Sequence, residues 1–203
     1  IIMPNRADNE AYINVDVDLR PLQAYLDKKN AGRTTDKFTY FHLISAAIGK
    51  AFVLRPRMNR FIVKNKIYQR KDITVAFVVK KTFSDKSEEG LAILKFDENS
   101  TIDSFHEDIM KVIHQTRRTD VKDTSSDAMD FLVKLPHFLT TFLVKLILLF
   151  DRKALVPDSV VGSDPNHAAI FLSNLGSIGL ECGYHHLVNW GTNSCFIVVG
   201  KKH

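Results

Sequence analysis

Apolar and polar side chains alternate along the first predicted element, which runs from Ala11 to Leu19. A period of two is typical of a strand with one buried face, here the face that carries the apolar residues at the odd positions. Pro21 follows, and proline fits the first turn of a helix. We therefore expect a half-buried strand and then a short helix from about Leu22 to Lys29.

The middle of the chain interleaves predicted helices and strands. Apolar residues at helical spacing predict a helix over Phe41–Leu54, which Pro56 ends. A second helix is expected after Ser100, whose hydroxyl is suited to capping it. Its predicted buried stripe is Phe105, Ile109, Val112 and Ile113. Strands are predicted at Phe61–Val63 and Ile67–Tyr68, joined as a tight hairpin by Lys64-Asn65-Lys66, and at Ile73–Val79, Leu91–Phe96 and Phe196–Gly200. This order predicts a mixed α/β fold.

Length and composition fit one globular domain. The chain has 203 residues, 45% of them hydrophobic and 25% charged, so it can bury a sizeable core and does not have the composition of a disordered protein. We expect both ends to be trimmed, because the chain begins with Ile-Ile and stops just after a strand. Its cysteines, Cys182 and Cys195, form neither a disulfide framework nor a metal pair, and Ile1–Asn14 lacks the apolar core of a secretory leader. A reducing, cytoplasmic location is therefore expected.

The segment Ile170–Gly179, which reads IFLSNLGSIG, stands before the last apolar strand. It resembles the catalytic-core signature of the dihydrolipoyl acyltransferases of 2-oxo acid dehydrogenase complexes, which share their fold with chloramphenicol acetyltransferase. Further similarities follow the family's order along the chain, at Leu54–Asn59, Asp72–Lys80 and Phe96–Arg117. One departure is Glu89–Lys95, which has no proline where the family has a Gly-Leu-x-x-Pro-Val run.

The resemblance implies a two-layer α/β sandwich over residues 1–203, with a mixed sheet and helices on one face. It also implies a homotrimer, and possible larger assemblies, with active sites between subunits. The implied reaction is coenzyme A-dependent acyl transfer by general-base catalysis, without a covalent enzyme intermediate. The chain carries no lipoyl attachment site, so the expected acceptor is a small diffusible molecule. The alternative is a catalytically inactive homolog that serves as an oligomeric assembly or binding module.

Such a transfer needs two chemical groups. A base must take the proton from a thiol whose free pKa is about 8.5, a task for which imidazole is suited. A donor must also bind the oxyanion of the tetrahedral intermediate. By resemblance, Ser173 is that donor; without the resemblance we would favour a role in capping the turn that leads to Gly176. Asn174, Gly176 and Gly179 are expected to shape this turn.

The implied base is a histidine in an H-x-x-x-D-G motif, which is not present in this chain. An enzyme is therefore expected only if that motif follows His203; a tail without it favours the inactive module. Among the eight histidines, His185 and His186 are adjacent, so at most one is expected to face a given site. Their spacing is not that of a helical zinc site, and no metal is expected. We favour packing or an interface for this pair over catalysis.

Between Lys37 and Lys71 the chain has nine lysines and arginines and no acidic residue, against a net charge of +5 overall. Coenzyme A carries a 3′-phosphate and a diphosphate, which a basic rim would attract. The candidate residues are Arg55, Arg57, Arg60 and Lys64. A solvated basic face explains the same pattern equally well. Nucleic-acid binding is not expected, because no recognised motif accompanies these charges.

The segment Phe131–Phe150 is long and apolar and is the poorest match to the family. Pro136 divides it, and the part beyond Pro136 is too short to span a bilayer, so an integral membrane protein is not expected. Two interpretations remain. We favour a helical pair that covers the core or makes a trimer contact over a peripheral helix that faces a membrane, because no dense basic cluster flanks the segment.

Overall fold

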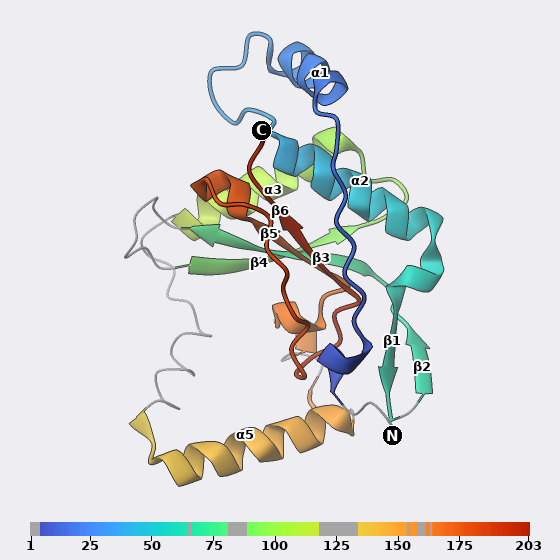
Figure 1. Cartoon of the computed structure of the whole chain (residues 1–203), viewed down its shortest axis with the longest axis vertical. Helices are drawn as coiled ribbons and strands as arrows, with labels where there is room; N and C mark the ends of the chain where they lie inside the picture. The colour runs from blue at the N-terminus through green and yellow to red at the C-terminus, as the bar shows by residue number, and fades with distance from the viewer. Residues whose placement is uncertain are drawn as a thin grey trace.

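A four-stranded mixed sheet with two helices on one face forms the centre of the molecule (Figure 1). The computed structural model describes residues 5–64, 66–80, 89–117, 134–153, 155–157, 161–162 and 164–203. The sheet has the order β4-β3-β5-β6, with bounds β3 (Ile73–Lys80), β4 (Glu89–Phe96), β5 (Ile170–Asn174) and β6 (Cys195–Val199). β3 is antiparallel to β4 and parallel to β5, and β5 is parallel to β6.

Helices α2 (Tyr40–Leu54) and α3 (Ile102–Arg117) cover one face of this sheet, which confirms the predicted two-layer sandwich (Figure 1). The other described elements are α1 (Arg20–Asn30), the hairpin strands β1 (Arg60–Val63) and β2 (Lys66–Gln69), and α5 (His137–Arg152). Four short 3₁₀ turns complete the order: η1 (Arg6–Asn9), η2 (Pro56–Asn59), η3 (Pro165–His167) and η4 (Leu175–Ile178). The predicted short helix, hairpin and two long helices are therefore all present.

Local sequence explains where α2 begins and how closely it packs. Its N-cap is Thr39, whose backbone N–H donates to Nδ1 of His42 over 3.0 Å, so a histidine side chain takes the place of the usual carboxylate or amide in a capping box. Gly49 lies against the ring of Phe96, where an added Cβ would come within 2.6 Å of ring carbons. The glycine therefore lets the helix lie close to the sheet.

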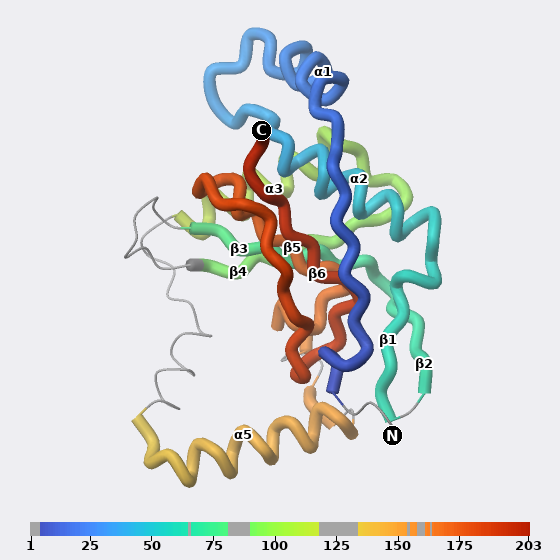
Figure 2. The backbone as a smooth tube through the Cα atoms, viewed as in Figure 1, coloured from blue at the N-terminus to red at the C-terminus, as the bar shows by residue number. Residues whose placement is uncertain are grey.

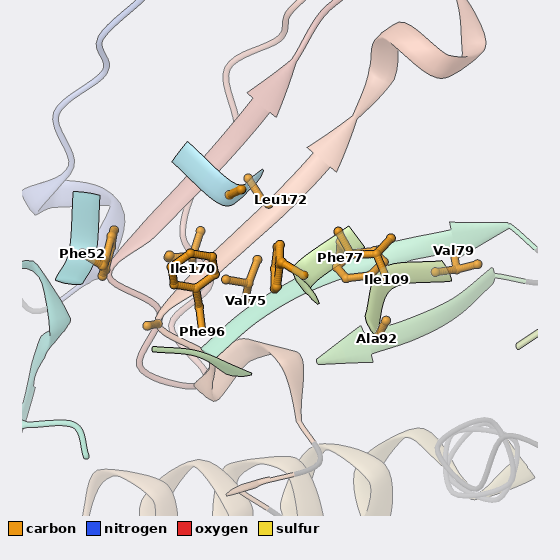
Figure 3. Packing of buried hydrophobic residues seen from close by; sticks show 12 residues of the cluster. Phe52, Val75, Phe77, Val79, Ala92, Phe96, Ile109, Ile170 and Leu172 are labelled. Atoms are coloured by element: carbon orange, nitrogen blue, oxygen red, sulfur yellow. The ribbon is translucent and has the colours of Figure 1, made fainter. Parts of the chain in front are cut away.

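The core lies between the two helices and the sheet (Figure 3). On β3 the buried side chains Val75, Phe77 and Val79 alternate along the strand, and they point toward the helices with Ile170 and Leu172 of β5. From the helices, the largest buried side chains are Phe52 of α2 and Phe105 and Ile109 of α3. Full burial of such a side chain is worth about 1.5–3 kcal/mol. Because side chains alternate along a strand, the intervening residues of β5 face away from the helices.

The prediction of a strand from Ala11 to Leu19 is wrong for this chain. The segment is extended but pairs with none of the described strands, and Ile13, Val15 and Val17 are 83%, 69% and 55% exposed. It runs beside the stretch that leads into β6 (Figure 2), where the ring of Tyr12 meets that of Tyr184 at 5.5 Å. Side-chain contacts hold the segment there without a backbone ladder, so the alternation does not bury one face.

Helix α5 lies apart from the sheet, on the side away from α2 and α3 (Figure 1). None of its residues is buried, so the prediction that this segment covers the core of its own chain is wrong for the part that is described. Residues 131–133 of the predicted segment lie outside the described residues. Among the helices that are described, none combines the length and apolarity needed to cross a bilayer.

Candidate acyl-transfer site

Ser173 lies on the face of the sheet opposite to the face that helices α2 and α3 cover. Its neighbours Ile170 and Leu172 are buried toward the helices, and the alternation of β5 turns Phe171 and Ser173 the other way. A hollow of about 250 Å³ opens on this face. Its lining combines strand residues with residues of the loops before and after β5: Val78, Asn166, Phe171, Ser173, His185, His186, Leu187, Val188, Asn193 and Phe196.

The hydroxyl of Ser173 has no hydrogen-bond partner among the residues that the structure describes. The capping of the following turn is done by Asn174 instead, whose Oδ1 accepts from the backbone N–H of Ser177 over 3.2 Å. Gly176 packs so closely on β6 that an added Cβ would lie 2.4 Å from the carbonyl oxygen of Gly200. Gly179 ends the turn at a φ of 77°. The turn is thus built without Ser173, and its hydroxyl is available to a ligand in the hollow.

Aromatic rings form the floor of the hollow beside Ser173. Phe171 and Phe196 stack with their ring centroids 4.9 Å apart. The imidazole of His185 stacks in turn on Phe196 at 3.9 Å, with its Nδ1 2.7 Å from the carbonyl oxygen of His186. An acyl group placed here would meet the apolar surface of these rings.

The imidazole of His186 meets a buried carboxylate at the border of the hollow. Its Nδ1 lies 3.1 Å from Oε2 of Glu10 and 2.6 Å from the hydroxyl of Tyr12. The Glu10 side chain is only 7% exposed. Burial opposes its ionisation, but hydrogen bonds from Tyr12, the backbone N–H of Leu187 and His186 outweigh that effect and lower the pKa of Glu10. A carboxylate bound to one imidazole nitrogen fixes the orientation of the ring.

Both adjacent histidines border the hollow, whereas we predicted that at most one would face a given site. The prediction assumed an extended strand, in which neighbours point to opposite faces. The stretch from residue 180 to 190 has no strand structure, so this alternation does not apply. Their rings still differ in direction: that of His185 lies on Phe196, and that of His186 meets Tyr12 and Glu10.

Comparison with known proteins links this geometry to one kind of fold. Neither a family model nor a curated protein sequence matches the chain. Solved structures do. The dihydrolipoamide acetyltransferase of Azotobacter vinelandii matches with a TM-score of 0.52 at 13% identity, over 85% of this chain and 55% of that one. The cubic core of the pyruvate dehydrogenase multienzyme complex matches with a TM-score of 0.53 at 13% identity, over 86% and 55%. A truncated catalytic core of the 2-oxoacid dehydrogenase multienzyme complex from Thermoplasma acidophilum matches with a TM-score of 0.54 at 11% identity, over 91% and 65%.

The chain has the fold of these catalytic cores. This confirms the resemblance seen in the IFLSNLGSIG segment at the level of architecture. The chain spans 55% of the length of the first two neighbours and 65% of the third, so an acyltransferase-core fold is shown here over part of their length.

The four residues predicted to bind coenzyme A are not among those that line the hollow with Ser173. Arg55 follows α2, Arg57 lies in η2, Arg60 begins β1 and Lys64 lies in the hairpin turn; all four are exposed, and none lines the hollow. Arg60 donates from Nε to the side-chain oxygen of Gln69 over 3.1 Å. The structure thus gathers the four at one end of α2 and the β1–β2 hairpin, where their role in binding stays a prediction.

Sequence reasoning missed a polar cluster around His167, next in the chain to Asn166, which lines the hollow. The imidazole of His167 lies between two carboxylates, with Nδ1 3.0 Å from Asp164 and Nε2 3.0 Å from Asp151 at the end of α5. Burial favours the neutral ring, but the two carboxylates outweigh it and raise the pKa of His167. Trp190 donates from its indole N–H to Asp164. Only the Asp164/His167 spacing is visible in the sequence; the contact with Asp151 depends on the fold.

Sequence reasoning also missed Arg70, the least exposed of the lysines and arginines between Lys37 and Lys71. Its guanidinium donates to the side chains of Thr192 and Ser194 over 3.1 and 2.9 Å. Burial, and then the nearby charge of Arg6, lower the pKa of Arg70 to about 10. Both arginines hold the stretch before β6 in place, since Arg6 also donates to the carbonyl oxygens of Val188 and Gly191. No cluster of three or more metal-ligating side chains occurs in the described ranges.

Proposed function

We propose that this chain carries the serine half of a coenzyme A-dependent acyltransferase site, at which an acyl group passes directly between a coenzyme A thioester and an acceptor. The observation that supports it most is the unpartnered hydroxyl of Ser173 at the edge of a hollow of about 250 Å³. The hollow lies on the sheet of a fold shared with acyltransferase catalytic cores. The hydroxyl would donate to the oxyanion of the tetrahedral intermediate, a contact worth about 3–4 kcal/mol.

The general base would be a histidine of a neighbouring copy, and not one of the histidines that line the Ser173 hollow. Among the neighbours, the Azotobacter vinelandii enzyme has been investigated for the role of a serine, a histidine and an asparagine in its catalytic mechanism. In this chain Ser173 would correspond to the serine. His186 is the internal competitor for the role of base, because Glu10 fixes one of its nitrogens and it borders the same hollow.

Binding of coenzyme A is assigned to the exposed bases Arg55, Arg57, Arg60 and Lys64. Exposed charges act mainly by attraction at a distance and are screened by salt. We therefore expect the affinity for coenzyme A to fall as ionic strength rises. Since these side chains do not line the hollow, they would hold the phosphates while the thiol end of the extended cofactor reaches Ser173.

Self-assembly, with a homotrimer as the specific form, is part of the proposal. One structural neighbour forms the cubic core of a multienzyme complex. In this chain the unpaired segment with Ile13, Val15 and Val17 presents alternating apolar side chains to solvent, and such a row is suited to burial against another copy.

The test uses the full-length protein, acetyl-coenzyme A as donor and dihydrolipoamide as acceptor, with product formation followed by chromatography and coenzyme A binding by calorimetry. Ser173→Ala is expected to lower kcat about 10²- to 10³-fold with little change in coenzyme A affinity. Thr35→Ala is the control, because it removes an exposed hydroxyl between α1 and α2 that does not line the hollow. Full-length protein that neither binds coenzyme A nor transfers an acyl group would end the proposal. His186→Phe is expected to retain activity; its complete loss would place the base in this chain instead.

A further inference from the structure

Helix α5 presents large apolar side chains to solvent. Phe138 is 76% exposed, Phe142 62% and Leu149 45%. These residues follow one another at intervals of four and seven, so at about 100° per residue they lie in a narrow arc of the helix. Lys145 and Arg152, also exposed, fall in the same arc. We call these five residues, spread over about 80° of the helix, the outer stripe.

The last turn of α5 is fixed to the body of the protein through Asp151, on the side opposite to the outer stripe. Elsewhere around the helix Val144, Ile147 and Phe150 are 40%, 41% and 43% exposed, less than Phe138 and Phe142. Asp151 contacts Nε2 of His167 at 3.0 Å, and its other oxygen accepts from the backbone N–H of Gly191 over 3.4 Å. The Asp151 side chain is only 14% exposed. The acidic residue of α5 is therefore already paired, and the charges left on its outer side, Lys145, Arg152 and the following Lys153, are all positive.

We propose that the outer stripe of α5 binds the surface of an anionic lipid bilayer. Phe138, Phe142 and Leu149 would enter the boundary between headgroups and acyl chains, while Lys145 and Arg152 extend to the lipid phosphates. A helix of 16 residues is about 24 Å long and lies in the plane of the surface without crossing it. This inference rests on α5 alone and does not depend on the acyltransferase activity.

Charge favours a bilayer over a symmetric pair of α5 helices. In a symmetric contact between two α5 helices along the outer stripe, Lys145, at the middle of the helix, would be buried near its own counterpart, and the outer stripe offers no carboxylate to pair with it. Anionic headgroups supply the missing negative charge, at about 1 kcal/mol for each basic residue close to the surface. Exposed aromatic residues, together with bases that have no acidic partner among the described residues, therefore fit a lipid surface better than a symmetric pair of α5 helices.

The experiment is flotation of the full-length protein with vesicles of phosphatidylcholine alone or of phosphatidylcholine and phosphatidylglycerol. The protein is expected to float with the anionic vesicles and to remain unbound with the neutral ones. Lys145→Glu together with Arg152→Glu should weaken binding by at least about 25-fold, which is about fivefold for each lost base. Phe138→Ser together with Phe142→Ser should weaken it by at least about tenfold. Added salt should weaken wild-type binding.

The matched control is Ile178→Ser together with Leu180→Ser on the turn after β5. The two side chains are 42% and 51% exposed, so the change removes apolar surface elsewhere, and binding should be unaltered. Circular dichroism checks the fold of each variant; if the phenylalanine variant does not fold, the charge variant alone decides. Equal binding to both vesicle types, or no binding to either, would overturn the proposal. So would outer-stripe variants that change the oligomeric state in light scattering while leaving flotation unchanged, since that result assigns the stripe to another copy.

Discussion

Acidification should destabilise this protein through a buried histidine that cannot take up a proton without loss. His42 is 5% exposed, and its Nδ1 accepts the backbone N–H of Thr39, so its proton is on Nε2. Nε2 has no hydrogen-bond partner in the described part of the chain. Burial, and then the charge of His106 at a ring distance of 4.6 Å, lower the pKa of His42 from 6.5 to about 4. The pKa of His106 is lowered in the same direction, by burial and then by Arg33, against hydrogen bonds and charge from Asp36.

The lowered pKa values determine how the stability of the protein changes with pH. Below pH 6.5 the unfolded chain binds protons at these histidines that the folded chain does not, so stability is complete above that value and falls as the pH falls. For His42 alone, the difference between 6.5 and about 4 corresponds to a loss of about 2 kcal/mol at pH 5 and about 3 kcal/mol at pH 4.

The assay is urea unfolding followed by the fluorescence of Trp190, at pH 7 and pH 5. The comparison variant is His42→Gln, because glutamine at this helix position can accept the same N–H of Thr39 without titrating. Between pH 7 and pH 5 the wild type is expected to lose about 2 kcal/mol more unfolding free energy than the variant. The titration of carboxylates changes the unfolding free energy of both proteins by the same amount, so it cancels in this difference. Equal losses in the two proteins would refute the reasoning.

Two further predictions concern the surroundings of the hollow. Gly176→Ala should reduce the unfolding free energy by about 1–3 kcal/mol, because the new Cβ would lie 2.4 Å from the carbonyl oxygen of Gly200. The control Gly183→Ala should be nearly neutral, because the nearest atom to its new Cβ is 4.0 Å away. Similar urea midpoints for the two variants would contradict this prediction. Asp151→Asn should lower the pKa of His167 below its raised wild-type value in an NMR titration. The stability that protonated His167 contributes is present below pH 6.5 and is lost as the pH rises through its folded pKa, so in the variant it should be lost at lower pH. An unchanged titration of His167 would show that Asp151 does not stabilise its protonated ring.

Local patterns were enough to predict the parts of the fold that depend on a nearby core. The stripe with Phe105 and Ile109 was predicted from its helical period, and both side chains are buried on the sheet. The segment from Ala11 to Leu19 failed because alternation indicates a strand only where a partner strand is available to bury one face. None of the described strands pairs with it, so the same pattern stays exposed.

The candidate site was only partly predictable, for a similar reason. The IFLSNLGSIG segment indicated Ser173, and the structure places that residue at a hollow. The residues around it come from segments far apart in sequence: Glu10 reaches His186, and Asp151 reaches His167. No spacing along the chain records such contacts, which depend on how the loops before β6 fold back over the sheet.

The position of bound coenzyme A tests the central claim most directly. A crystal structure of the full-length protein with coenzyme A should place the thiol sulfur in the hollow lined by Phe171 and Phe196, close enough to Ser173 that a thioester oxygen can accept a hydrogen bond from its hydroxyl. Coenzyme A bound at another site would contradict the account. So would a hollow closed by another part of the full-length protein, with the Ser173 hydroxyl sealed from any ligand.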